Sequence, residues 1–328
     1  MATDQQTLRI ATRTSRLALW QAETVKALLE RSGHACELVL IESTGDMHFT
    51  QPIYAMGISG VFTKQLDIAL LDGTADIAVH SLKDVPTQMA QGLTLTATLE
   101  RGAYQDIAII KDKKILNPDH GRAVIATSSL RRRAQWLAKY PAHTTAPIRG
   151  NVQTRLRKFE ENKDVSGVIF AKAGLERLDL LPADAIVLDW MIPAPAQGIV
   201  GIVCRDNDET TKQKCAEINN QDAFIAGYIE RQFLRTLLGG CSVPISALAV
   251  TDGNKIKFKG AMHSFDGSRY FIVEKEFVLA PSPLERAGGE VWKDAGQQAA
   301  EELLSQTGAK ELLEEIKNKK WDAEGTVD

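Results

Sequence analysis

The sequence predicts two α/β lobes joined by a hinge, followed by a small α+β domain with an antiparallel sheet. Short apolar segments alternate with helical patterns as far as about residue 190, which favours parallel sheets covered by helices on both faces. One apolar strand at 198–205 then follows without a helix series of its own, so we expect it to return to the first sheet. After residue 245, apolar and polar residues alternate between Asp-Gly turns, which is typical of an antiparallel meander.

The first lobe is expected to open with a strand at 8–12 and a helix that Ser15 caps and that runs to about Arg31. The inward stripe of this helix is predicted to comprise Leu17, Trp20, Thr24 and Leu28. The remaining elements are strands at 36–43, 75–81 and 92–100 and a helix at 61–72. The long connection before that helix is too long for a simple turn, which indicates a functional or mobile segment. A change of pattern at 101–106 indicates a hinge.

The elements of the second lobe and of the tail are predicted from the same patterns of apolar and polar residues. The predicted strands lie at 106–110, 123–128, 144–149, 165–171 and 185–190, with helices at 129–140, 151–162 and 174–178 between them. Pro193 and Pro195 mark a crossing between lobes, residues 209–239 are expected to be helical, and helices from about 283 to 319 should cover the meander. The predicted domains are therefore 1–99 with 198–218, then 100–197, then 219–328.

Composition excludes several classes of protein. The chain has 328 residues, of which 44% are hydrophobic and 25% charged, which excludes disordered, collagen-like and disulfide-scaffold proteins. No apolar run has the length of a signal peptide or membrane span, so we expect a cytoplasmic protein that does not bind membranes. The cysteines and histidines form no CxxC or HExxH pattern, and no glycine-rich nucleotide motif is present, so we expect neither a metal nor a nucleotide cofactor.

The charge of the chain is unevenly distributed. The net charge is −3, but the segment from Arg122 to Arg177 contains eight Arg and four Lys against four acids, a net of +8. The rest of the chain therefore sums to −11. This segment indicates a site for an anion. Nucleic acid is a weaker interpretation because no aromatic residues are interleaved at stacking spacing between Arg149 and Arg157.

Polar and basic residues follow several predicted strands. Ligands bind outside the carboxyl ends of parallel strands, where helix N-termini and guanidinium groups favour anions. For a single arginine, a solvated surface charge is the more common explanation, but four strand ends with the same character favour a site. The residues concerned are Arg13, Ser15, His80, Ser81, Lys83, Asp84, Ser128, Ser129, Arg131, Arg132, Arg149, Gly150, Asn151 and Arg155.

Two of the candidate residues have two interpretations from the residues alone. Asp84 could be a carboxylate held among cations that stabilises a developing cation or moves a proton, or it could form a strand-end salt bridge. Cys241 follows two glycines, a setting for a reactive thiol, but lone cysteines are commonly buried apolar residues. The buried apolar role is predicted for Cys36 and Cys204, which both lie in apolar strands.

Six motifs in order resemble those of the hydroxymethylbilane synthases, also called porphobilinogen deaminases. They are LRIATRTSRLALWQA, GVFTKQLDIALLDGTADIAVHSLKDVP, ATSSLRRRAQ, IRGNVQTRL, PAPAQGIVGIVCR and LGGCSVP, and the resemblance extends over about residues 8–250. It implies two lobes like those of type II periplasmic binding proteins and a third domain. It also implies a transferase of tetrapyrrole and heme biosynthesis that condenses four porphobilinogens head to tail, releases ammonia and hydrolyses off hydroxymethylbilane.

The resemblance also implies a cofactor and roles for individual residues. A dipyrromethane cofactor would be attached by a thioether to Cys241, and Asp84 would be the catalytic carboxylate that stabilises the electron-poor ring left by loss of ammonia. The cationic segment would then hold the acetate and propionate groups of the pyrroles. Cofactor and substrate would contact Arg13, Ser15, Phe62, Ser81, Lys83, Thr127, Ser128, Ser129, Arg131, Arg132, Arg149, Gly150, Asn151, Arg155, Arg177 and Gln197.

The sequence departs from the family pattern at three positions: Ser59 stands where many members have lysine, Gln153 where glycine is usual, and Thr14 where glutamine or glycine is common. The family also implies a monomer. The main alternative is a two-lobed anion-binding protein without catalysis, because the same architecture serves both functions. Binding to nucleic acid would instead predict steep salt dependence.

Overall fold

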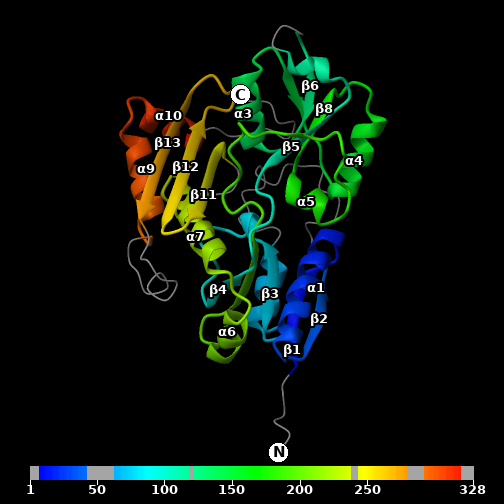
Figure 1. Ribbon diagram of the computed structural model, residues 1–328, viewed down its shortest axis with the longest axis vertical. Coiled ribbons are helices and arrows are strands. Elements are labelled where there is room, and N and C mark those ends of the chain that lie inside the picture. Colours follow the sequence, from blue (N-terminus) through cyan, green and yellow to red (C-terminus); the bar gives the residue numbers. More distant parts are fainter. Residues whose placement is uncertain (1–6, 43–62, 118–120, 238–242, 279–291, 319–328) are drawn as a thin grey trace, which may run out of the picture.

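The computed structural model describes residues 7–42, 63–117, 121–237, 243–278 and 292–318 (Figure 1). The first sheet has the order β2-β1-β3-β10-β4. Its strands are β1 (Leu8–Arg13), β2 (Cys36–Ile41), β3 (Ile77–Ser81), β4 (Leu93–Thr98) and β10 (Val200–Arg205). The late strand β10 lies antiparallel between β3 and β4, which confirms the predicted return to the first sheet.

The second sheet repeats this arrangement with the order β7-β6-β8-β5-β9. Its strands are β5 (Asp106–Ile110), β6 (Val124–Ala126), β7 (Thr144–Ala146), β8 (Gly167–Ala171) and β9 (Ile186–Val187). In each sheet the fourth strand is antiparallel to its neighbours and is the strand that enters directly from the crossing between lobes. The expectation of parallel sheets is therefore wrong for that position. The shared order is that of a type II periplasmic-binding-protein lobe, so the predicted fold class is confirmed.

Helices lie against both sheets. In the first lobe they are α1 (Arg16–Arg31), α2 (Lys64–Leu71) and α6 (Glu209–Ala216), and in the second α3 (Leu130–Lys139), α4 (Val152–Glu161) and α5 (Lys172–Glu176). Two 3-10 turns, Leu82–Asp84 and Lys113–Leu116, complete the two lobes. The predicted capping is confirmed for α1, because the Ser15 hydroxyl accepts a hydrogen bond from the Ala18 N–H at 3.4 Å.

The inward face of α1 differs from the prediction. Ala22, Val25 and Leu29 are fully buried against the first sheet, whereas Leu17, Thr24 and Leu28 are half-buried and Trp20 is 37% exposed. Ala22, Val25 and Leu29 are spaced i, i+3 and i+7, so they share one face of the helix, and this face is rotated from the predicted one. Trp20, Thr24 and Leu28 line a surface crevice beside Arg177 instead.

The third domain packs helices on a meander. Strands β11 (Ile245–Asp252), β12 (Lys255–His263) and β13 (Tyr270–Val278) form the predicted antiparallel sheet. One apolar core joins this sheet to α7 (Gln221–Leu237), α9 (Ala295–Ser305) and α10 (Ala309–Asn318). In Figure 1 this domain stands beside both lobes, and α7 lies between its sheet and the first lobe.

Two chain segments cross between the lobes side by side. The Gly102 N–H donates to the Gly198 carbonyl at 3.1 Å, and Gly198 has a φ of +88°. A Cβ atom at position 198 would lie 2.7 Å from the Gly102 carbonyl oxygen. Glycine is therefore required here both by conformation and by close approach of the second segment.

Candidate active site

The turn that follows β3 presents an exposed carboxylate at the lobe crossing. Leu82 is fully buried and anchors the turn, whereas Asp84 at its end is exposed. Within the described ranges, no side chain or backbone group forms a hydrogen bond or ion pair with the Asp84 carboxylate. Burial lowers the pKa of both Lys83 and Arg155, and the charge of Asp84 opposes that shift in both, so Asp84 lies close to cations from the two lobes. A carboxylate in this position is available to a ligand.

Asp106, the first residue of β5, organises the arginines that follow β6. Its buried carboxylate forms ion pairs with Arg131 and Arg132, both at 2.7 Å. The two guanidinium groups hold the pKa of Asp106 well below its usual range, against the opposing effect of burial, the largest single influence. Arg131 also donates to the Ile192 carbonyl at 2.8 Å, and Arg132 to the Ile169 carbonyl at 3.1 Å. Both arginines are therefore fixed in place before any ligand binds.

Gln197 connects this cluster to the first lobe. Its buried amide donates to Asp106 at 3.0 Å and to the Tyr104 carbonyl at 2.8 Å, and its side-chain oxygen accepts from the Lys83 ammonium at 3.3 Å. The Gln197 carbonyl accepts from Arg101 at 2.9 Å. The predicted residue Gln197 thus lies between β3, β5 and the crossing.

The second lobe adds a patch of positive charge around α4. The Arg155 guanidinium donates to the Gly150 carbonyl at 2.7 Å. Burial, together with the nearby charges of Arg132 and Arg149, lowers the pKa of Arg155 to about 10, and the charge of Asp84 opposes this shift. Lys83, Arg132, Arg149 and Arg155 are therefore close enough to Asp84 or to one another for their charges to interact.

Several predicted polar residues shape the backbone of the site. Ser128 both donates to and accepts from the Ile148 backbone, at 2.9 and 3.0 Å. Ser129 caps α3 and Asn151 caps α4, and the Thr127 hydroxyl accepts from the Ser129 N–H. These side chains hold two helix N-termini at the carboxyl ends of β6 and β7, an arrangement that favours anions.

The first-lobe residues lie at the carboxyl ends of β1 and β3. Arg13 ends β1, and Ser81 ends β3, where its hydroxyl accepts from Gln21 at 2.8 Å. Burial, together with the charges of Arg13 and Arg231, lowers the pKa of the neighbouring His80 to about 4. His80 is therefore neutral at pH 7, whereas Arg13 brings a positive charge to this end of the sheet.

Arg177 lies apart from the cationic cluster. Its guanidinium donates to the Gly198 carbonyl at 2.7 Å and lies 5.2 Å from the centre of the Trp20 ring. It therefore joins α5 of the second lobe to α1 of the first at the crossing. Phe62, Ser59 and Cys241 lie outside the described residues. Cys204 is fully buried as predicted, but Cys36 is only half-buried because β2 is an edge strand.

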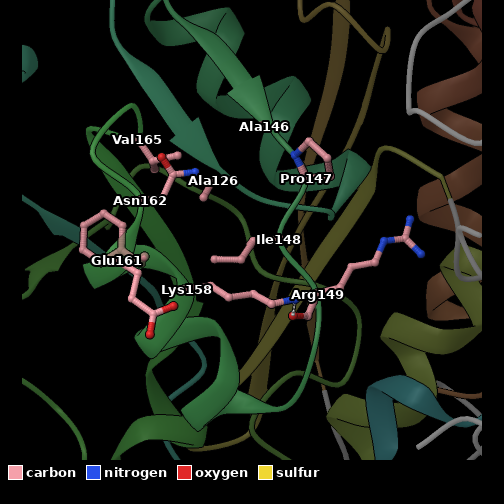
Figure 2. A pocket seen from close by; sticks show the side chains of 10 residues that line it. Ala126, Ala146, Pro147, Ile148, Arg149, Lys158, Glu161, Asn162 and Val165 are labelled. Carbon is pink, nitrogen blue, oxygen red and sulfur yellow. Dashed lines mark hydrogen bonds between the residues drawn. The ribbon is translucent and has the colours of Figure 1, made fainter. Parts of the chain in front are cut away.

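The crevice in Figure 2 is a different feature. It has a volume of about 480 Å³ and lies between β7 and α4, with Ala126, Pro147, Ile148 and Val165 among the residues that line it. The Arg149 side chain extends away from the other labelled side chains. Neither Asp84 nor Asp106 lines this crevice, so the charged cluster at the crossing is the candidate active site.

Sequence reasoning missed four residues that support the site: Arg101, Asp106, Glu230 and Arg231. An acid at the head of the apolar strand DIAII and an acid within the apolar stripe of α7 are both signals of a buried charge that needs a partner. Glu230 is fully buried and pairs with Arg101 at 2.6 Å. The identity of each partner required the structure.

Comparisons with known proteins show which family the chain is similar to. Residues 8–213 match the family model described as the dipyromethane cofactor binding domain of porphobilinogen deaminase, and residues 224–305 match its C-terminal domain. The porphobilinogen deaminase of Syntrophomonas wolfei is 38% identical over 304 residues, which cover 92% of this chain and 98% of the relative. That of Chlorobium phaeobacteroides is 40% identical and covers 94% and 98%. The chloroplastic protein of Oryza sativa is 39% identical and covers 92% and 84%.

Solved structures are more distant. The methionine binding protein MetQ is 14% identical, with a TM-score of 0.41, and the match covers 67% of this chain and 93% of that one. No helix in the described ranges is long and apolar enough to cross a membrane. Two family models that together span most of the chain, and relatives near 40% identity over nearly its full length, establish the relationship. This chain belongs to the porphobilinogen deaminase family.

Proposed function

We propose that this protein is a hydroxymethylbilane synthase that condenses four porphobilinogens head to tail, with release of ammonia, and releases linear hydroxymethylbilane by hydrolysis. The observation that carries the proposal is the surplus of cations around one exposed carboxylate. Lys83, Arg131, Arg132 and Arg155 interact electrostatically with one another and with the acids Asp84 and Asp106, and the charge of Arg149 acts on Arg155. Porphobilinogen carries an acetate and a propionate, which such a surplus suits.

The donor set also suits the cofactor of the family. When bound, dipyrromethane supplies the pyrrole chain to which substrate units are added. Its carboxylates would pair with Arg131, Arg132, Arg149 and Arg155, and a buried Arg131 Nε has no hydrogen-bond partner among the described residues. We propose a thioether to Cys241 as the attachment. The segment that contains Cys241 follows α7 directly in sequence.

Some residues of the site would bind the carboxylates of the substrate, and another would transfer protons. Arg13, Lys83 and the second-lobe arginines would hold the acetate and propionate groups, with the helix caps at Ser129 and Asn151 adding backbone N–H donors. The Asp84 carboxylate would accept hydrogen bonds from pyrrole N–H groups. There it would stabilise the positive charge that develops as ammonia leaves and move a proton at each addition.

The proposal extends to the domain boundaries, the oligomeric state and partners, and the residues that shape the site. The domains are 1–99 with 198–218, 100–197 and 219–328. The protein acts as a cytoplasmic monomer without nucleic-acid or membrane partners. Ser81, Thr127, Ser128, Gly150, Arg177 and Gln197 act mainly by shaping the site, as their backbone and side-chain hydrogen bonds indicate.

An activity assay tests the proposed function. Purified protein incubated with porphobilinogen should release ammonia in proportion to the substrate consumed, and acidified, oxidised product should show porphyrin absorbance. Protein that binds porphobilinogen without consuming it would support the anion-binding alternative and contradict the proposal.

Lys83 predicts a pH dependence of substrate binding. Burial, together with the charge of Arg132, lowers its pKa to about 8, and the charge of Asp84 opposes this shift. Lys83 loses its charge as the pH rises through about 8, so the KM for porphobilinogen should increase above that pH. Lys83→Arg should abolish the increase because arginine stays protonated. The matched change Lys139→Arg, on an exposed residue of α3, should leave it in place. A wild-type KM that stays flat through pH 8 would remove Lys83 from carboxylate binding.

A further inference from the structure

One arginine of the third domain holds the turn that carries Asp84. The Arg231 guanidinium, on α7, donates from Nη1 to the carbonyls of Leu82 and Val85, at 3.2 and 2.7 Å. Its Nη2 donates to the Pro86 carbonyl at 2.7 Å. The three carbonyls lie on both sides of Asp84 in sequence. A single planar group therefore fixes the backbone before and after the carboxylate.

Apolar packing presses the same turn against the same helix. Leu82 and Val85 are buried in one cluster with Ala223 of α7 and with Ala196 and Ile199 of the crossing segment.

Gly227 lies one turn before Arg231 on the helix. A Cβ atom at this position would lie 3.1 Å from Leu82 Cδ2 and 3.2 Å from Ile199 Cδ1. The helix backbone thus reaches the turn at a distance that leaves little room for a side chain.

The residue before Arg231 on α7, Glu230, fixes the lobe crossing. The buried Glu230 carboxylate accepts from the N–H groups of Ala196 and Ala249, at 2.5 and 2.6 Å, and pairs with Arg101. Two consecutive residues of α7 therefore hold the crossing and the Asp84 turn. The chain then continues from this helix into the segment with Cys241.

We propose that Arg231 is a positioning residue that sets the place of the Asp84 carboxylate relative to α7. The proposal rests on the proposed function in one respect, the catalytic role of Asp84. Fixing the turn on α7 would keep the carboxylate at one place while the cationic patch of the second lobe accommodates a lengthening product. Lysine cannot reproduce this arrangement because its ammonium is a compact donor without the planar fork that spans three carbonyls.

Steady-state kinetics of Arg231→Lys, alone and combined with Asp84→Asn, test this role. We expect Arg231→Lys to lower kcat about 10- to 100-fold, because a displacement of about 1 Å in a reacting group costs that much, with KM nearly unchanged. In the Asp84→Asn background, Arg231→Lys should lower kcat little further, because the carboxylate that Arg231 positions is already absent. Arg231→Gln, which retains one amide group as donor, should also lower kcat when Asp84 is present and lower it little further when Asp84 is replaced. This second variant shows whether the effect is specific to lysine.

The control is Arg235→Lys, the same substitution on the same helix at an exposed residue one turn later. Kinetics are measured well below each melting temperature, on protein whose intact mass shows the attached cofactor. The proposal is overturned if both Arg231 variants keep wild-type kcat, or if they lose the same factor with and without Asp84. If Asp84→Asn itself is fully active, the proposed function of Asp84 fails instead, and the two failures are thereby distinguished.

Discussion

Asp84→Asn is expected to lower the turnover of porphobilinogen about 10²- to 10⁴-fold, the range by which a positioned acid or base contributes. The amide keeps the size of the side chain but can neither balance a developing cation nor accept a proton as a carboxylate does. Folding should be unaffected, because the carboxylate is exposed and has no partner within the described ranges. Cofactor attachment and the melting temperature should therefore stay close to those of the wild type.

The matched control for this variant is Asp206→Asn. Asp206 is also an exposed aspartate directly after a strand of the first sheet, but β10 is antiparallel to β3, so it lies at the opposite end of that sheet. It should retain wild-type turnover. A near-normal rate for Asp84→Asn, measured as porphobilinogen consumed per enzyme, would remove Asp84 from its catalytic role.

Asp106→Asn should have the largest effect on stability. The substitution leaves Arg131 and Arg132 buried without the carboxylate that both of them contact. Removal of one partner from a buried ion pair costs about 3 to 5 kcal/mol, so the free energy of unfolding in urea should fall by about that amount. Asp164→Asn, on an exposed residue of the same lobe, should change it by no more than about 0.5 kcal/mol.

Acid unfolding provides a second measure of Asp106. Its pKa is held below the usual range, so its contribution to stability is present above the pKa of the unfolded carboxyl and is lost as the pH falls through the folded value. Asp106→Asn should therefore show a shallower loss of stability in acid than the wild type. Equal stability of Asp106→Asn and the wild type at pH 7 would contradict the account of the arginine cluster.

Local patterns in the sequence were sufficient to predict most elements and their caps. Strand β5 and the start of α1 follow the predictions because apolar periodicity and capping residues act over a few neighbouring positions. The antiparallel strands β5 and β10 were not predicted as such, because strand direction within a sheet depends on the path of the whole chain. The face of α1 that packs on the sheet carries Ala22, Val25 and Leu29, which is about one residue away from the predicted stripe, and it leaves Trp20 beside Arg177.

The candidate site was also predictable from the sequence only in part. The excess of arginine and the strand ends could be found from composition and spacing, but the partners of each charge could not. Asp106 contacts Arg132 across 26 positions, and Arg231 contacts Leu82 across 149. Such pairs leave no local pattern, so the groups that hold the reactive carboxylate in place emerge only when the chain is folded.

The intact mass of the protein, with and without limiting porphobilinogen, tests the central claim most directly. Without substrate, the mass should exceed that of the chain by one dipyrromethane, and Cys241→Ser should lack this addition. With substrate, a series of species should appear, each heavier by one porphobilinogen less ammonia. Wild-type protein that turns over porphobilinogen at the mass of the unmodified chain, without any such series, would contradict the account.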